Sequence, residues 1–217
     1  MSALEVAIRI GFVVVSVALW FYSQAKISTC KPPPLADSPI GDRLHTWSTP
    51  WHTWLTARRE RSSRLLIITS AGIDVFGVYL LAATIFGSSI RPIVALLIVL
   101  ALRQFCQYLV SLPAPAGVVW HHPGFPSLFV TYHVANDYFF SGHTAIAAAA
   151  TMQLAHVAPW WVVTLALLGT IIEAGSVIVL RAHYTMDVFA AIFATVAADT
   201  AATWLAPGID SLLNGLG

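Results

Sequence analysis

Residues 160–180 read WWVVTLALLGTIIEAGSVIVL, an unbroken apolar run in which Glu173 is the single ionisable side chain. At about 1.5 Å of rise per helical residue, a run of this length crosses the roughly 30 Å hydrocarbon core of a bilayer. The remaining runs of similar character lie at about Val6–Ala25, Leu65–Phe86, Ile90–Leu112, Phe139–Val157 and Tyr184–Leu205. The sequence therefore predicts an all-α membrane protein with about six transmembrane helices.

The composition also favours a lipid-facing surface over that of a soluble globule. Hydrophobic residues make up 58% of the 217 residues and charged residues only 10%. The net charge is +1 and the lysines and arginines form no long basic run, so nucleic acid is not expected as a partner. We expect one multi-pass domain over 1–217, with a first span and charged interfacial segment in 1–64 and a five-helix catalytic core in 65–217. The first run resembles a signal-peptide core, but its length favours a retained span.

Tryptophans and arginines gather in the segment between the first two predicted spans. Trp47, Trp51, Trp54 and Leu55 fall at helical spacing and precede four arginines, Arg58, Arg59, Arg61 and Arg64. This pattern predicts a short Trp-rich helix over about Trp47–Leu66 at the headgroup level, with a solvated loop as the alternative. Alternating the spans places this segment, the Pro-rich stretch 113–137 and the turn at Arg181 on one membrane face. That face holds most of the cations, so the positive-inside rule favours the cytoplasm.

Two polar segments interrupt the apolar background, NDYFFSGHT at 136–144 and RAHYTMD at 181–187. His183 and Asp187 are four residues apart and hence share a helical face, so the carboxylate can orient one ring nitrogen and leave the other free to attack. Ser141 is a candidate N-cap, and the helix start at Gly142 offers free amides to a phosphate oxygen. A protonated His143 at that position suits a general acid for a departing alkoxide.

These residue types also occur in membrane helices for other reasons. A lone histidine or a buried acid such as Glu173 in a membrane helix often serves only as an interhelical hydrogen-bond partner, as in a non-enzymatic membrane protein. Histidines with carboxylates also bind metals, and His121, His122 and His133 lie nearby, but no metal-binding spacing such as His-x-x-x-His is present. The combination of both polar segments favours catalysis on a phosphate.

The segments SGHT at 141–144 and HYTMD at 183–187 resemble the two histidine motifs of the sphingomyelin synthases and of the plant phosphatidylcholine:diacylglycerol cholinephosphotransferase, within the type 2 phosphatidic acid phosphatase superfamily. Asp137 is similar to the aspartate of the synthases' Cys-Gly-Asp motif. Arg103 is similar to the arginine before a Leu-Pro-x-Pro turn in both relatives, and Arg181 to a residue of the plant enzyme. The resemblance covers about Arg103 to Val196.

This resemblance implies a six-helix fold and a two-step headgroup transfer, with no metal or other cofactor. His183 would take a phosphocholine or phosphoethanolamine group from a glycerophospholipid and pass it to diacylglycerol or ceramide. The implied substrate-binding residues are Arg103, Asp137, Ser141, Gly142, Arg181 and Tyr184. The family's synthases imply an exoplasmic site, which disagrees with the charge count.

One departure from the superfamily bears on the reaction. Its phosphatases carry a Lys-x6-Arg-Pro motif and a Ser-Arg pair, whereas here Ser176 precedes Val177 and no Lys-x6-Arg-Pro exists. Fewer cations suit a phosphodiester with one charge better than a monoester with two. A lipid phosphatase or phospholipase-C-like hydrolase is the alternative. An aromatic box for a quaternary amine could come from Trp120, Phe125, Tyr132 and Tyr138.

Overall fold

The computed structural model describes residues 2–28, 40–110, 112–132 and 138–215, and within them all regular structure is helical. Hydrophobic periodicity and length decide where the helices lie, and the ends follow capping residues such as Asp42 and Ser141. The eight helices are α1 Ala3–Ser28, α2 Arg43–Trp47, α3 Thr49–Thr56, α4 Arg59–Phe86, α5 Arg91–Leu109, α6 Gly142–Val157, α7 Trp160–Val179 and α8 Thr185–Asn214.

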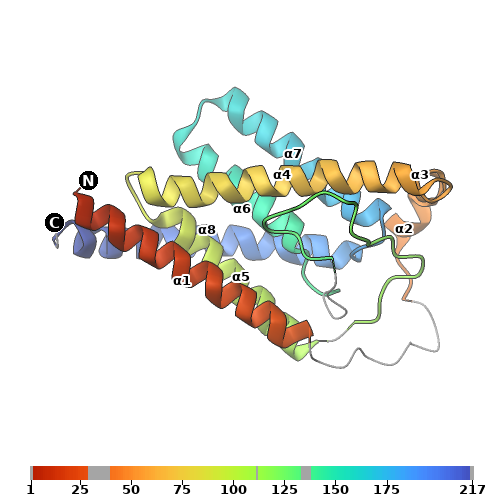
Figure 1. Ribbon diagram of the computed structural model, residues 1–217, viewed down its shortest axis with the longest axis horizontal. Coiled ribbons are helices and arrows are strands. Elements are labelled where there is room, and N and C mark those ends of the chain that lie inside the picture. Colours follow the sequence, from red (N-terminus) through yellow and green to blue (C-terminus); the bar gives the residue numbers. More distant parts are fainter. Residues whose placement is uncertain (1, 29–39, 111, 133–137, 216–217) are drawn as a thin grey trace.

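Five helices, α1, α4, α5, α7 and α8, are long and apolar enough to cross a membrane. The prediction of an all-α, multi-pass membrane protein is confirmed. The expected span Phe139–Val157 is shorter than predicted, because Phe140 has a φ of 76° and the helix starts only at Gly142. Although α6 is short, both termini lie at the same end of the bundle, opposite to α2 and α3 (Figure 1). The chain therefore passes through the bundle an even number of times, with the 16-residue α6 as the short pass.

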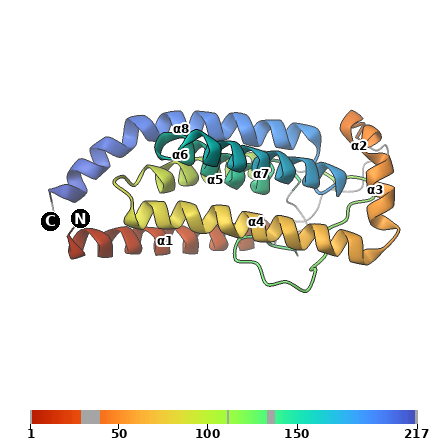
Figure 2. The ribbon, with the colours of Figure 1, turned by 90° about the horizontal axis from the view of Figure 1, so that it is seen from above.

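The short helix α6 is the centre of the bundle. It contacts α4, α5, α7 and α8, and Figure 2 shows it enclosed between its neighbours. Its alanines allow this close packing, since small side chains let helix backbones approach one another in a membrane. The buried alanines are Ala145, Ala147, Ala148, Ala149 and Ala150.

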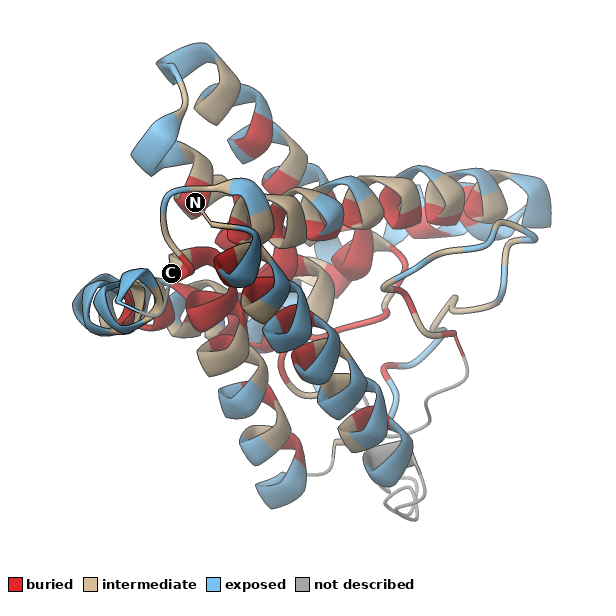
Figure 3. Ribbon diagram, turned by 60° about the vertical axis from the view of Figure 1, so that its left-hand side comes forward, coloured by how far each residue is buried: buried red, intermediate tan, exposed pale blue. Residues whose placement is uncertain are grey.

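Large apolar side chains on the bundle's outer surface face outward, as lipid contact requires. Val15 and Leu19 of α1, Leu168 of α7 and Phe193 of α8 are all more than half exposed. Figure 3 shows the buried positions on the inward helix faces and the exposed ones on the outside. Without water to drive burial, this is the expected surface of a membrane bundle.

The predicted Trp-rich interfacial helix is present, but it is shorter than expected. The segment breaks at Ser48 and again at Ala57–Arg58, so Trp47 ends α2, Trp51 and Trp54 lie in α3, and Arg59 begins α4. Trp51 and Trp54 are exposed on α3, while Leu55 is buried against the bundle. The Arg61 guanidinium lies 4.3 Å from the Trp54 ring centroid, which joins α4 to α3.

The described residues between α5 and α6, 112–132 and 138–141, form a non-helical cap over the end of the bundle nearer to α2 and α3. Asp74 of α4 fixes one part of it, because its carboxylate accepts hydrogen bonds from the Ser127 hydroxyl (2.8 Å) and the Phe129 amide (3.1 Å). A second part is held by the Val119 amide, which donates to the Leu180 carbonyl at 2.9 Å. The cap is therefore tied both to α4 and to the turn between α7 and α8.

The opposite end of the bundle is fixed by a buried cation. Arg9 of α1 pairs with Glu5 at 2.8 Å and donates to the carbonyls of Thr84 (3.1 Å) and Gly87 (2.8 Å). Its guanidinium also lies 3.6 Å from Asp210 of α8. A charge buried this deeply requires such partners, and they join both termini to the α4–α5 turn.

Candidate active site

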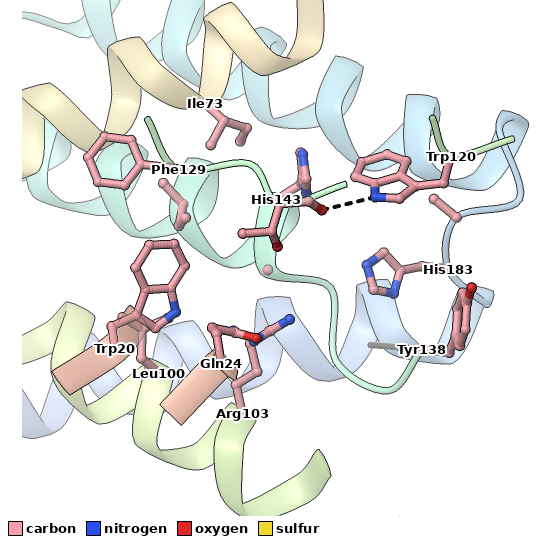
Figure 4. Close-up of a pocket in the computed structure, with 14 residues that line it drawn as sticks. Trp20, Gln24, Ile73, Leu100, Arg103, Trp120, Phe129, Tyr138, His143 and His183 are labelled. Carbon is pink, nitrogen blue, oxygen red and sulfur yellow. Dashed lines mark hydrogen bonds between the residues drawn. The ribbon is translucent and has the colours of Figure 1, made fainter. Parts of the chain in front are cut away.

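The two polar segments recognised in the sequence meet at one point of the fold. The Ser141 amide donates to the Asp187 carbonyl at 3.2 Å, which links the start of α6 directly to the start of α8. His143 and His183 consequently line one cavity, which encloses about 650 Å³ of space including its open mouth (Figure 4). The other polar and aromatic residues of its wall are Trp20, Gln24, Arg103, Trp120, Phe129, Thr131 and Tyr138.

His183 is held by the tight turn between α7 and α8. Arg181 adopts a φ of 55°, and the amides of Ala182 (2.8 Å) and His183 (3.3 Å) both donate to the Val177 carbonyl. The Nδ1 atom of His183 lies 3.4 Å from Oδ2 of Asp187. Because Nδ1 faces the carboxylate, Nε2 is the ring nitrogen left for the cavity.

Asp187 is fully buried and has a second partner in the same turn. Its Oδ2 accepts the Tyr184 amide at 2.8 Å, completing a capping box at the start of α8. Its Oδ1 has no hydrogen-bond partner among the described residues, and neither has Nδ1 of His183. Since Nδ1 lies 3.4 Å from the other carboxylate oxygen, the carboxylate is placed to orient the ring.

His143 occupies the first turn of α6, on the other side of the cavity. Ser141 caps this helix by accepting from the Thr144 hydroxyl (3.0 Å) and amide (3.4 Å). The edge of the His143 ring meets Trp120, with ring centroids 5.2 Å apart. Its Nε2 atom is buried and has no hydrogen-bond partner in the described part of the chain, so it is available to a ligand.

Arg103 brings a positive charge to the same wall. It is 3% exposed, and its Nε donates to the Phe140 carbonyl at 3.3 Å. A Cβ atom at Gly142 would lie 3.2 Å from Nε of Arg103, so glycine is the residue that lets the guanidinium lie flat against the start of α6. Arg103 and the α6 amides together place positive charge at one corner of the cavity, an arrangement suited to an anion.

A comparison with protein families assigns the chain to a family. The model of the AtPDCT1/2 family matches residues 45–204, nearly three quarters of the chain. The chain belongs to the AtPDCT1/2 family, the phosphatidylcholine:diacylglycerol cholinephosphotransferases. It is thus a membrane lipid phosphotransferase, which confirms the resemblance and the enzyme class expected from the two histidine motifs. A search of curated proteins finds no match.

The similarity extends further than the sequence motifs indicated. The match begins at residue 45 and so includes α3 and α4, whereas the resemblance was recognised only from Arg103 onwards. His45 and His52 in this added part contact the site directly. His45 Nε2 donates to the His183 carbonyl at 2.9 Å, and His52 Nδ1 donates to the Val179 carbonyl at 2.8 Å. In this cholinephosphotransferase, α2 and α3 therefore hold the turn that carries His183.

Three of the expected substrate-binding residues are not found in the cavity wall. Arg181 donates to the Ala116 carbonyl of the cap (2.8 Å) and to the Thr49 hydroxyl at the start of α3 (3.3 Å). Tyr184 donates to the Pro113 carbonyl at 3.1 Å, and its ring stacks on His45. Ser141 is fully buried as the cap of α6. In this structure their contacts are with the framework around the cavity.

The other expected binding residues have mixed outcomes. Gly142 and Arg103 line the cavity, whereas Asp137 lies outside the described residues. Of the expected aromatic box, Trp120 and Tyr138 line the cavity, and Phe125 and Tyr132 do not. Trp20 and Phe129 complete the aromatic wall, and neither was singled out from the sequence as a cavity residue. Among the described residues, no group of three or more histidine, cysteine or acidic side chains is arranged to hold a metal ion.

Asp42 is a further residue that sequence motifs did not reveal. One carboxylate oxygen accepts the Leu44 amide (2.9 Å) and the Thr185 hydroxyl (2.7 Å), and the other accepts the Thr185 amide (2.7 Å). Asp42 thus caps α2 and binds the first residue of α8 through hydrogen bonds. Burial opposes ionisation, but the hydrogen bonds from Thr185 and from the His45 amide outweigh it and lower the pKa of Asp42.

We expect Asp42→Ala to lower the stability of the purified enzyme by about 1 kcal/mol, the usual cost of a lost cap. Because the pKa of Asp42 is lowered, its contribution is present above the ordinary value of 3.8 and is lost as pH falls through the shifted pKa. Thermal unfolding of both proteins in detergent should differ at pH 7 and converge in acid. The same difference at all pH values would contradict a stabilising role for the ionised Asp42 carboxylate.

Proposed function

We propose that the chain moves phosphocholine from phosphatidylcholine to diacylglycerol by two displacements at His183. The observation that carries the proposal is the shared cavity, in which His183, His143 and Arg103 face one space while Asp187 lies buried behind His183. A nucleophile, its orienting carboxylate, an acid and an anion-binding corner are thereby present in one place. Its membership of the AtPDCT1/2 family supports the choice of substrates.

In the first displacement, Nε2 of His183 attacks the phosphorus of phosphatidylcholine. The bond between phosphorus and the glycerol oxygen breaks, and protonated His143 gives its proton to that oxygen, releasing diacylglycerol. Phosphocholine is left bonded to Nε2, and the positive charge that develops on the imidazole is stabilised by Asp187 at Nδ1.

In the second displacement, the hydroxyl of another diacylglycerol attacks the same phosphorus. His143, now neutral, takes the hydroxyl proton, and the bond between phosphorus and Nε2 breaks. Phosphatidylcholine with new acyl chains leaves, and His183 and His143 regain their starting states. The acceptor and the leaving group are both diacylglycerol. One site with one acid–base residue can therefore catalyse both displacements.

The charges and aromatic rings of the cavity support a choline phosphodiester. Arg103 is the one arginine or lysine among the described residues of its wall, which matches the single negative charge of a diester. Trp120 and Tyr138 offer ring faces to a trimethylammonium group. This favours phosphocholine over phosphoethanolamine as the transferred group.

The proposal is tested with purified enzyme in vesicles containing headgroup-labelled phosphatidylcholine. We expect labelled product only when diacylglycerol of a distinguishable chain length is added, and little label in water-soluble phosphocholine. Ceramide in place of diacylglycerol tests the second acceptor. Label released to water at the same rate with and without acceptor would instead establish the phospholipase-C-like hydrolase.

A further inference from the structure

A second cavity continues from the active site into the apolar part of the bundle. It encloses about 410 Å³ between α1, α4 and α5, and four residues line both cavities: Trp20, Leu100, Phe129 and Ile146. Ser16 is the one hydroxyl residue of the second wall, and its hydroxyl already donates to the Phe12 carbonyl at 2.7 Å. The wall is thus suited to hydrocarbon.

The same helix faces run from one cavity into the other. On α4, Ile73 lines the first cavity, and Gly77 and Leu81, each one turn further on, line the second. On α5 the direction is reversed, from Arg103 at the first cavity to Ile93 at the far end of the second. At about 1.5 Å per residue, this path along α5 is about 15 Å long.

The cap shapes the junction between the two cavities. Asp74 holds the Phe129 amide at 3.1 Å, and a Cβ atom at Gly77 would lie only 2.5 Å from the Phe129 ring. The absence of a side chain at Gly77 is what lets Phe129 enter the bundle. There it meets Trp20, with ring centroids 6.3 Å apart and planes tilted by 36°.

Two buried polar atoms at this junction have no hydrogen-bond partner among the described residues. They are Nε1 of Trp20, a donor, and Oε1 of Gln24, an acceptor. Gln24 is 5% exposed and lines the first cavity, and Figure 4 shows both side chains beside Arg103. Leaving such groups unpaired is costly, which indicates that a ligand pairs with them.

We propose that the second cavity binds one acyl chain of the diacylglycerol moiety, and that Trp20 and Gln24 bind its glycerol backbone at the junction. The indole N–H donates to an ester carbonyl. The glutamine oxygen accepts the hydroxyl of the incoming diacylglycerol, before that hydroxyl turns its proton toward His143 for the displacement. An acylglycerol has this order of groups: a hydroxyl or phosphate, then esters, then hydrocarbon. Trp20 and Gln24 precede residue 45, so the family match assigns them nothing.

This inference rests on the proposed transfer to diacylglycerol and is tested by acceptor competition. Full-length enzyme in vesicles with labelled phosphatidylcholine receives equal amounts of dioctanoylglycerol and dioleoylglycerol. Leu81→Trp fills the far end of the cavity, so we expect the ratio of dioleoyl to dioctanoyl product to fall about tenfold relative to wild type. Val78→Trp is the matched control, since Val78 lies on α4 but is 49% exposed on its outer face, and its ratio should equal that of wild type.

An unchanged ratio in Leu81→Trp would overturn the acyl-chain site, whereas absence of acceptor-dependent product in wild type would overturn the proposed function itself. If Leu81→Trp transfers to neither acceptor, the smaller Leu81→Phe gives the same reading. Trp20→Phe keeps the ring and removes the N–H, so we expect the KM for diacylglycerol to rise about fivefold with kcat little changed, the pattern of a lost binding contact. An unchanged KM would remove Trp20 from the glycerol site.

Discussion

Replacing His183 with alanine is expected to reduce kcat for phosphatidylcholine-to-diacylglycerol transfer by about 10⁴-fold, the scale seen when an enzyme loses its nucleophile. The reason is that the ring nitrogen proposed to form the covalent intermediate is lost, while Arg103 and the start of α6 would still bind the phosphate. The measurement is the initial rate of labelled product formation in vesicles with equal amounts of each protein.

His156→Ala is the control for loss of a histidine outside the cavity. His156 lies at the far end of α6, where its Nε2 is 3.2 Å from Asp199, and its removal should change the rate by less than about twofold. A His183→Ala protein that folds and still transfers at a tenth of the wild-type rate would exclude His183 as the nucleophile.

Replacing His143 with alanine is expected to lower kcat by about 10³-fold, within the range for general acid–base residues. The loss should depend on the leaving group, because a good leaving group needs no proton. With p-nitrophenyl phosphocholine as donor, His143→Ala should release a burst of one nitrophenolate per enzyme at nearly the wild-type rate.

The same donor separates the two histidines. His183→Ala should give no burst, since it lacks the atom that accepts phosphocholine, whereas His143→Ala should give a burst and then stop. Stopped-flow absorbance of nitrophenolate provides the reading. An equal loss of the burst in both variants would show that His143 supports the nucleophile and does not protonate the leaving group.

The proposed reacting residues could be predicted from the sequence because their signal is local. His183 and Asp187 lie four residues apart and do come together, but α8 begins only at Thr185, so His183 lies in the preceding turn and not on the expected helical face. Ser141 to Thr144 contains both the cap of α6 and His143, as the sequence predicted. That the two segments face one cavity was inferred from their positions at helix starts on one predicted face, and the shared cavity agrees with this.

The surrounding shell could not be predicted in the same way, because its contacts join distant parts of the chain. Asp42 reaches Thr185, and His45 reaches the His183 carbonyl, across a stretch that carried no recognisable motif. Trp20 and Gln24 lie in the predicted first span and carry no motif. The sequence of a single apolar helix does not indicate which of its faces lines a cavity. The site accordingly takes residues from both sides of the division expected at residue 64.

Arg181 shows that the distance between two residues in the sequence does not determine where a side chain points. Its place two residues before His183 suggested a phosphate ligand, but its positive φ turns the side chain toward the carbonyl of Ala116 in the cap. The length of α6 was overestimated for a related reason. Apolar Phe139 and Phe140 extend the hydrophobic run without extending the helix, because Phe140 has a left-handed backbone.

The central claim, that phosphocholine passes through a covalent bond to His183, is tested most directly by the stereochemistry at phosphorus. A phosphorothioate analogue of phosphatidylcholine with one configuration at phosphorus is given to the enzyme with diacylglycerol, and the configuration of the product is determined. Each in-line displacement inverts the phosphorus, so two displacements predict overall retention. Inversion would mean direct attack by diacylglycerol on the donor lipid and would contradict a phosphocholine–His183 intermediate.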